Sequence, residues 1–373
     1  MAFVTFSTLW SFSGFFFLTY LTTIISAVVY LLPVVSTQTN TTSTSTVRTN
    51  FSFVNATEVL PVLITPGLLF LVTCVSWSAP ATSVWFGHLI VTSFQLKMTY
   101  LVLLSFLLSL IVLTSTVYLS SREVYDYLNV TFTICYWLIL LFAANSILTV
   151  IFVIEVISAA LFLLIITSVF STTYFYRNLN LSFGHMTQQV TPFTYLQSLL
   201  FFFWVSLISS LNLFLFTTLL YLKLLTLDWT LIEYLSMYMV NSSTPRDVYA
   251  LGLTWCIFLF CIFLKCGLAP LYVWKPTFFK GIPIYTLFFY VSFFYFILFI
   301  FLIHLLTVCF GEIFYYFSSL TTLFTILGLV ALLAILCESF YLKVFLAMSS
   351  ILNSLLVMLA LAVPHTLDGL FWL

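Results

Sequence analysis

The sequence predicts an all-α polytopic membrane protein, and three observations carry this prediction. Of the 373 residues, 63% are hydrophobic and only 5% are charged, too few for the surface of a soluble domain. The apolar runs are long and do not alternate with polar residues, which argues against a membrane barrel of strands. The formal net charge is zero, so no electrostatic attraction to nucleic acid is expected.

The apolar runs predict about ten membrane-spanning helices, because each helix needs about 20 residues to cross the hydrocarbon core. We expect spans at residues 8–35, 59–78, 99–119, 131–148, 150–171, 194–222, 249–269, 284–308, 314–336 and 343–363. The segment 81–95 is too polar to count as a span and is a candidate interfacial segment. The chain, residues 1–373, is therefore expected to form a single integral membrane domain, with the first span in residues 1–35.

The connecting segments predict a polar loop and an orientation. Residues 36–57 are rich in Ser, Thr and Asn, which predicts a polar loop after the first span. Lysines and arginines are more frequent in the connections on one side, and the positive-inside rule makes that side the inner one. Lys275, Lys280 and Lys343 belong to that side and are expected in or near inward-facing loops.

Two ionisable residues lie firmly within the expected spans, Glu155 and Lys265. A charge in mid-membrane costs about 2.5–3.5 kcal/mol on insertion scales and is usually functional. A carboxyl in hydrocarbon is either protonated or paired with a cation, so Lys265 is the expected partner of Glu155. A change in their spacing would take up or release a proton, which makes the pair a candidate for proton translocation. A static ion pair that only fixes helix packing is the alternative.

A helix break is predicted directly after Lys265. The segment from Phe260 to Pro283 reads FCIFLKCGLAPLYVWKPTFFKGIP, in which Gly267 and Pro270 follow the lysine within five residues. Both residue types interrupt a helix and free backbone groups that need protein or water partners. A charge beside a broken helix inside a membrane is typical of an ion or proton site.

The sequence offers no metal or cofactor site. Cys256, Cys261 and Cys266 are five residues apart, so they do not share one helical face, and they do not have zinc-ligand spacing. The four histidines form no pair with metal-ligand spacing. A phosphate-binding loop, a dinucleotide fingerprint and a nucleophile elbow are all absent. We therefore expect this chain to bind no metal or cofactor and to have no redox active site of its own.

The segment from Lys265 to Pro283 resembles the signature of NADH dehydrogenase subunit 2, a family of antiporter-like membrane subunits of respiratory complex I. The family pattern is approximately F-K-x-x-x-x-P-F-H-x-W-x-P-D-V-Y-x-G-A-P. The chain keeps in register, without a gap, Lys265, Pro270, Trp274, Pro276, Gly281 and Pro283. Two further matches are the segment around Glu155, which resembles G-L-E-L-x-S, and the segment from Lys343, which resembles K-R-L-L-A-Y-S-S-I.

The chain departs from the family at several ionisable positions. Tyr272 stands where the family has a histidine, and Asn353 replaces another histidine. Phe201 and Tyr295 stand where the family has lysines in its sixth and eighth helices. Tyr272 and Tyr295 keep a hydroxyl and are candidate relay substitutes, although tyrosine, with a reference pKa of about 10, stores protons poorly. Within this resemblance, a role in proton translocation and a purely structural role in the membrane arm both stay open.

The resemblance also implies a setting for the chain. It implies a multi-pass protein of the mitochondrial inner membrane that lies among lipids and other membrane-arm subunits of complex I (NADH:ubiquinone oxidoreductase). The abundant Phe, Tyr and Leu have thymine-rich codons, which favours an organelle-encoded protein. The resemblance divides the chain into a first antiporter-like half at residues 59–248 and a partial second half at 249–373. We expect the remaining C-terminal helices either to be supplied by a separate polypeptide or to be lost.

Two alternatives from other classes remain. An independent secondary transporter would also use a broken helix and a buried Glu155–Lys265 pair, and it would purify alone or with itself. A protein of the secretory pathway would carry glycans at the sequons Asn40, Asn50 or Asn55.

Overall fold

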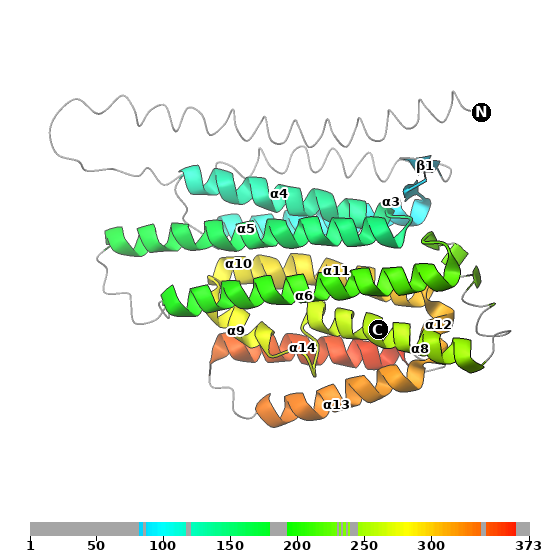
Figure 1. Ribbon diagram of the computed structural model, residues 1–373. Coiled ribbons are helices and arrows are strands. Elements are labelled where there is room, and N and C mark those ends of the chain that lie inside the picture. The colour runs from blue at the N-terminus through cyan, green and yellow to red at the C-terminus, as the bar shows by residue number, and fades with distance from the viewer. Residues whose placement is uncertain are drawn as a thin grey trace. The chain divides into compact units, whose positions relative to one another are not determined.

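The computed structural model describes residues 82–84, 87–116, 121–179, 192–229, 231–232, 234–235, 238, 245–336 and 341–362. Its elements are β1 (Thr82–Val84), β2 (Leu89–Val91), α3 (Ser93–Thr116), α4 (Ser121–Ala143), α5 (Ile147–Leu179), α6 (Pro192–Leu224), α8 (Pro245–Cys266), α9 (Trp274–Gly281), α10 (Ile284–Phe289), the π-helix η2 (Tyr290–Tyr295), α11 (Phe296–His304), the π-helix η3 (Leu305–Cys309), α12 (Gly311–Tyr316), α13 (Ser318–Leu336) and α14 (Leu342–Leu361) (Figure 1). The expected span in residues 1–35, the polar loop 36–57 and the span 59–78 lie outside the described residues.

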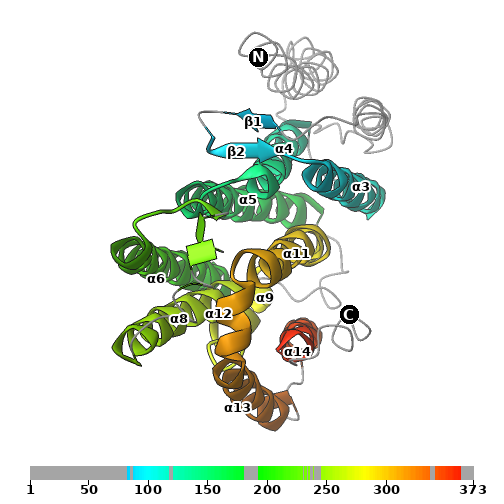
Figure 2. The ribbon, with the colours of Figure 1, turned by 90° about the vertical axis from the view of Figure 1, so that its right-hand side faces the viewer.

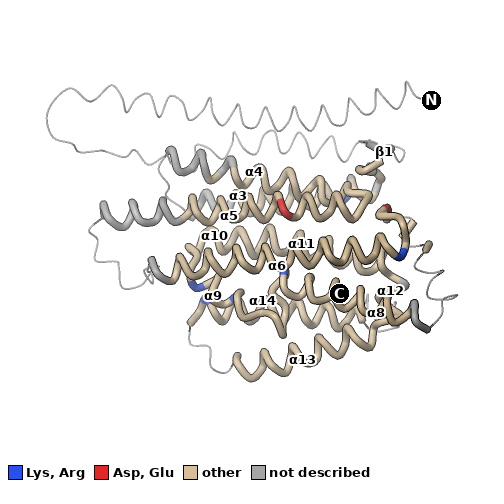
Figure 3. Tube along the Cα trace, in the orientation of Figure 1, with Lys and Arg blue, Asp and Glu red and all other residues tan. Residues whose placement is uncertain are grey.

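The prediction of an all-α polytopic membrane protein is confirmed. Six described segments are long and apolar enough to cross a membrane, and they are Ile147–Ser168, Thr194–Leu224, Val248–Cys266, Ile284–Cys309, Ser318–Leu336 and Leu342–Leu361. They correspond to the six expected spans that begin between residues 150 and 343. Charged residues are sparse along the described helices (Figure 3). Two shorter apolar helical stretches, Lys97–Leu110 and Val130–Ala143, belong to α3 and α4.

The bounds of one expected span are wrong, and one segment has a structure that the sequence did not predict. Helix α4 begins at Ser121 and ends at Ala143, whereas the apolar count predicts residues 131–148. Its first turns carry charged residues that are good helix formers but lower the local hydropathy, so counting apolar residues misses them. In the candidate interfacial segment 81–95, β1 and β2 pair as an antiparallel hairpin, with the turn residue Gly87 at a φ of 89°. Glycine reaches this left-handed conformation without steric cost.

The chain forms two compact units. Unit 1 takes its described residues from Met1–Ala144, Val156–Met186 and Pro283–Ile297, and unit 2 takes its described residues from Asn145–Glu155, Thr187–Ile282 and Leu298–Leu373. Helix α5 and the helical segment from α10 to α11 therefore contribute residues to both units.

An aromatic cluster holds unit 1 together. The ring of Phe106 on α3 lies 5.2 Å from the ring of Phe132 on α4 and 5.2 Å from that of Phe293 on η2. The hydroxyl of Tyr285 on α10 donates a hydrogen bond of 2.6 Å to the backbone carbonyl of Ser168 on α5. These contacts bury aromatic rings, which contribute about 0.5–1.5 kcal/mol per pair beyond their buried area.

In unit 2, helix α6 packs against α8 and α9, and α14 packs against α9 and α13. Figure 2 shows α8 beside α6 and α13 beside α14. The core between α6 and α8 is aromatic, since the rings of Phe216 and Phe258 stack at 4.6 Å and the ring of Phe310 lies 5.1 Å from that of Phe258. Every segment that supplies the site described below belongs to this unit.

Candidate functional site

Helix α8 ends at the predicted break. Gly267 follows its last residue with a φ of 62°, a left-handed conformation that terminates helices. The amide of Leu268 donates to the carbonyl of Phe263 at 2.8 Å, and the amide of Gly267 donates to that of Leu264 at 3.3 Å. This pair of bonds is the Schellman motif. The chain becomes helical again at Trp274, the first residue of α9 (Figure 1).

Two side chains of α9 satisfy further carbonyl groups at the end of α8. The indole Nε1 of Trp274 donates to the carbonyl oxygen of Leu264 at 3.0 Å. The Nζ of Lys275 donates to the carbonyl oxygen of Cys266 at 3.4 Å. The break therefore supplies side-chain donors to backbone acceptors that a continuing helix would have satisfied, as a low-dielectric environment requires.

A third helix packs closely on the break. A Cβ atom at Gly328 of α13 would collide with the backbone carbonyl oxygen of Ala269, the residue before Pro270. Glycine at this position thus lets α13 approach the broken segment within backbone contact. Gly267 and Pro270 interrupt the helix, and Gly328 allows the interruption to be covered.

Glu155 and Lys265 form the ion pair expected from the sequence. The Nζ of Lys265 on α8 lies 2.9 Å from the Oε1 of Glu155 on α5. The side chains are 16% and 31% exposed, respectively, so the pair lies near the interior of unit 2 with partial access from outside it. Its two residues are 110 positions apart in the chain, so the tertiary fold brings them together.

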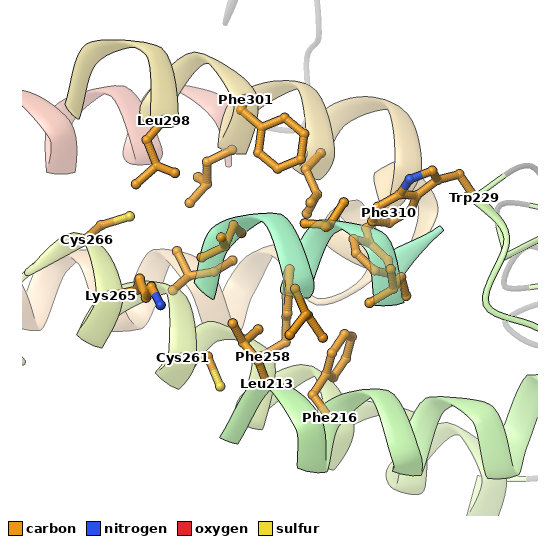
Figure 4. A pocket seen from close by; sticks show the side chains of 17 residues that line it. Leu213, Phe216, Trp229, Phe258, Cys261, Lys265, Cys266, Leu298, Phe301 and Phe310 are labelled. Atoms are coloured by element: carbon orange, nitrogen blue, oxygen red, sulfur yellow. The ribbon is translucent and has the colours of Figure 1, made fainter. Parts of the chain in front are cut away.

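The ion pair adjoins an apolar cavity of about 70 Å³ (Figure 4). From α5 the lining residues are Ile147, Val150, Ile151 and Ile154, and from α8 they include Phe258, Cys261, Ile262 and Lys265. Both sets follow the i, i+3, i+4, i+7 spacing of one helical face. The face of α8 ends in Lys265, and that of α5 ends next to Glu155. The same periodicity that builds the core therefore places the two charges side by side.

Figure 4 shows Leu298 and Phe301 above this cavity and Lys265 at one side of it. An aliphatic and aromatic lining disfavours water, since a cavity holds water only where polar groups can bind it. Low polarity around the pair strengthens the attraction between its charges. A change in hydration or packing at this cavity would therefore act directly on the ion pair.

The expectation that Lys275 lies in or near a loop is wrong. Its side chain is 0% exposed, and it belongs to α9. A proline follows it directly, and the helix break precedes it, so the sequence reads as a connecting loop. The break predicts a loop after Lys265, but the chain returns to the core as helix α9. A hydrophobic face formed by Trp274, Phe278 and Phe279, all of which are buried, would have indicated this.

The other predicted site residues are placed as follows. Tyr272 lies in the break and belongs to unit 2, Tyr295 lies on η2 and belongs to unit 1, and both are buried. Phe201 on α6 is 39% exposed, and Asn353 on α14 is exposed. The roles of Tyr272 and Tyr295 as relay substitutes stay predictions.

Lys280 and Lys343 lie within one turn of helix ends. Lys280, near the end of α9, is exposed, with its Nζ 4.8 Å from the ring centre of Tyr341. Lys343, near the start of α14, donates through its Nζ to the carbonyl oxygen of Ile282 at 2.8 Å. They tie the start of α14 to the segment around α9. Among the residues described, no three His, Cys, Asp or Glu side chains come together as a metal site.

Comparisons with known proteins identify the fold. No protein-family model and no curated protein sequence matches the chain. Among solved structures, a chain of respiratory complex I from Thermus thermophilus with bound aureothin matches with a TM-score of 0.56 and 16% identity, over 92% of this chain and 65% of that one. A chain of the membrane-bound sulfane sulfur reductase, an archaeal respiratory membrane complex, matches with a TM-score of 0.56 and 15% identity, over 94% of this chain and 52% of that one.

This chain therefore spans about half to two thirds of the length of those solved chains. At such low identities the likeness is one of fold. The broken helix, the ion pair and the multi-pass helical architecture belong to a chain that shares its fold with chains of two respiratory complexes.

Proposed function

We propose that the chain is an antiporter-like membrane-arm subunit of a complex I-type respiratory assembly, and that its Glu155–Lys265 ion pair takes part in proton translocation. The fold likeness to chains of two respiratory membrane complexes supports the assembly. The match to the subunit 2 signature around Lys265 supports that subunit and hence the mitochondrial inner membrane. Electron transfer and redox cofactors then belong to other subunits.

The observation that carries the proton-translocation part is the ion pair of 2.9 Å beside a broken helix. A closed pair holds both groups charged, because each charge stabilises the other. When the two separate, the lysine loses its counter-ion in surroundings of low polarity and tends to release its proton. Opening and closing of the pair thus changes how many protons it holds, which is the elementary step of a pump.

A structural role in the membrane arm is the second candidate, and a specific observation favours it. Phe201, at the position of a family lysine, has no ionisable group and is 39% exposed on α6. Tyr295 replaces the other expected lysine on η2. A chain with this pair alone can be part of the arm without completing a path across the membrane.

The experiment that separates these functions compares Lys265→Met with Glu155→Gln in the native complex. Proton movement per electron transferred from NADH is measured in sealed membrane vesicles. The proposal expects the assembled complexes of both variants to show a lower proton-to-electron ratio or a slower coupled turnover. Assembled variants that move protons at the wild-type ratio would leave the structural role. Purification of the chain alone, or only with copies of itself, would instead support the secondary transporter.

A further inference from the structure

The side chain of Lys275 is the most deeply buried charged group among the residues described. It is 0% exposed, whereas Lys265 retains 16% exposure of its side chain. A lysine usually keeps its ammonium group in water while its methylene stem covers apolar surface. Complete burial removes this option and imposes a desolvation penalty on the charged form. A residue at such a position therefore needs a reason beyond covering the core.

The backbone around Lys275 is shaped to admit its side chain. A Cβ atom at Gly267 would lie 3.0 Å from the Cδ and 3.2 Å from the Cβ of Lys275. Gly267 thus both ends α8 and leaves room for the lysine stem. The Nζ then reaches the carbonyl oxygen of Cys266 at 3.4 Å, at the C-terminal end of α8. That end carries the partial negative charge of the helix dipole, which favours a cation there.

Most of the ionisable groups on the elements packed against α9 are cysteines, tyrosines and lysines. Helix α8 carries Arg246, Asp247, Tyr249, Cys256, Cys261, Lys265 and Cys266. Helix α6 carries Tyr195, Tyr221 and Lys223, and α14 carries Lys343. The break carries Tyr272, and α9 itself also carries Lys280. Both lysines are therefore attached to the last turn of α8, since Lys265 precedes Cys266 in the helix and the Nζ of Lys275 donates to the carbonyl oxygen of Cys266.

We infer that Lys275 is a second proton-carrying residue of this chain, which takes up and releases a proton at the end of the broken helix. The inference rests on the proposed function and extends it to a residue outside the family signature, at a position where that signature leaves the residue type free. The carbonyl of Cys266 is a neutral acceptor that receives an ammonium or an amine N–H. Lys275 can therefore keep its position in both protonation states.

The proton step conserves atoms and charge. When the Glu155–Lys265 pair opens, an N–H bond of the Lys265 ammonium breaks, and a new N–H bond forms on the lone pair of the Lys275 amine. Lys265 is left neutral, and Lys275 becomes the ammonium that the end of α8 stabilises. Release of the same proton restores the Lys275 amine. No electron is transferred, and no other reactant is needed.

The experiment uses the complete native complex with Lys275→Met and Lys275→Arg. Methionine matches the length of the stem but holds no proton, and arginine holds its proton permanently. If Lys275 must alternate between two states, both variants assemble, and NADH-driven proton translocation falls by roughly tenfold or more, since removing a proton-transfer group costs about 10²–10⁴ in rate where that step limits. Lys280→Met is the matched control, because Lys280 lies on the same helix but is exposed.

Several outcomes overturn the inference. Wild-type translocation by Lys275→Arg would make the residue a static cation that caps α8, and wild-type translocation by Lys275→Met would make it a spacer. If Lys275→Met, Lys275→Arg and Lys275→Gln all fail to assemble, the residue is a structural cap and the inference is wrong. The variant Lys265→Met distinguishes failure of this inference from failure of the proposed function. If Lys265→Met slows proton translocation and the Lys275 variants do not, only the inference fails. If Lys265→Met does not slow translocation either, the proposed function fails.

Discussion

Glu155 and Lys265 depend on each other because each would leave an uncompensated charge if the other were removed. We expect Lys265→Met alone to destabilise unit 2 by about 1–3 kcal/mol, the usual penalty for an unsatisfied buried polar group. The double variant Glu155→Gln/Lys265→Met removes both charges, and replacing a whole ion pair by neutral groups is often tolerated. Its assembly should therefore recover towards the wild-type level. The amount of intact complex on native gels and its thermal unfolding measure this.

Recovered assembly should not bring back proton movement in the double variant. Lys223→Met and Lys280→Met are the control variants for proton movement, because they remove charges that lie at the surface of unit 2. A double variant destabilised by the sum of the two single variants would show that the two side chains are not energetically coupled, in spite of their 2.9 Å separation.

Among individual residues, the sequence predicts the Glu155–Lys265 ion pair but not the burial of Lys275. Glu155 and Lys265 are predictable because a charge inside a long apolar run needs a partner, and the chain offers few. Lys275 is not predictable in the same way, because a lysine between Trp274 and Pro276 has no apolar run around it. Its burial depends on how α9 folds back against α6 and α14, which is a tertiary effect.

At the scale of elements, the end of α8 depends on Gly267. We expect Gly267→Ala to destabilise the complex by more than about 1 kcal/mol, because alanine is strained at a φ of 62° and its Cβ would press on Lys275 and Trp274. Gly311→Ala is the control, since nothing lies within 4 Å of a Cβ at that position and its φ is not in the left-handed region. Thermal unfolding of the two variants makes the comparison. Equal melting temperatures would contradict the conclusion that α8 ends at Gly267 because glycine tolerates the left-handed conformation there.

Some boundaries of helices and strands can be predicted from the local sequence, and others cannot. The break is predictable because glycine and proline act on their own backbone. The early start of α4 at Ser121 and the hairpin of β1 and β2 are not, since both concern segments of mixed polarity in which an apolar count gives no signal. The start of α5, by contrast, follows a local rule of helix capping. The amide of Ser146 donates to the hydroxyl oxygen of Thr149, and the amide of Thr149 donates to the hydroxyl oxygen of Ser146, each at 3.3 Å, a reciprocal pattern like that of a capping box.

For the whole molecule, the composition predicts the membrane class, while partners require a measurement. We expect the chain to be found in a large heteromeric complex together with subunits that oxidise NADH. Mass spectrometry of the native complex tests this, and an additional small membrane polypeptide of constant stoichiometry would support the expectation that C-terminal helices are supplied by another chain. A chain without such partners, or a gel shift after glycosidase treatment, would contradict the mitochondrial assignment.

The closed hydrogen bonding of the break has a consequence for its motion. The amides of Gly267 and Leu268 donate to carbonyls of the preceding turn, and the side chains of Trp274 and Lys275 hold two of the last carbonyls of α8. Amide protons here should exchange with deuterium as slowly as those of uninterrupted helix, since exchange requires these bonds to open. The break would then be rigid, so a displacement of α8 would move α9 with it. Bending would have to occur in other segments of the chain.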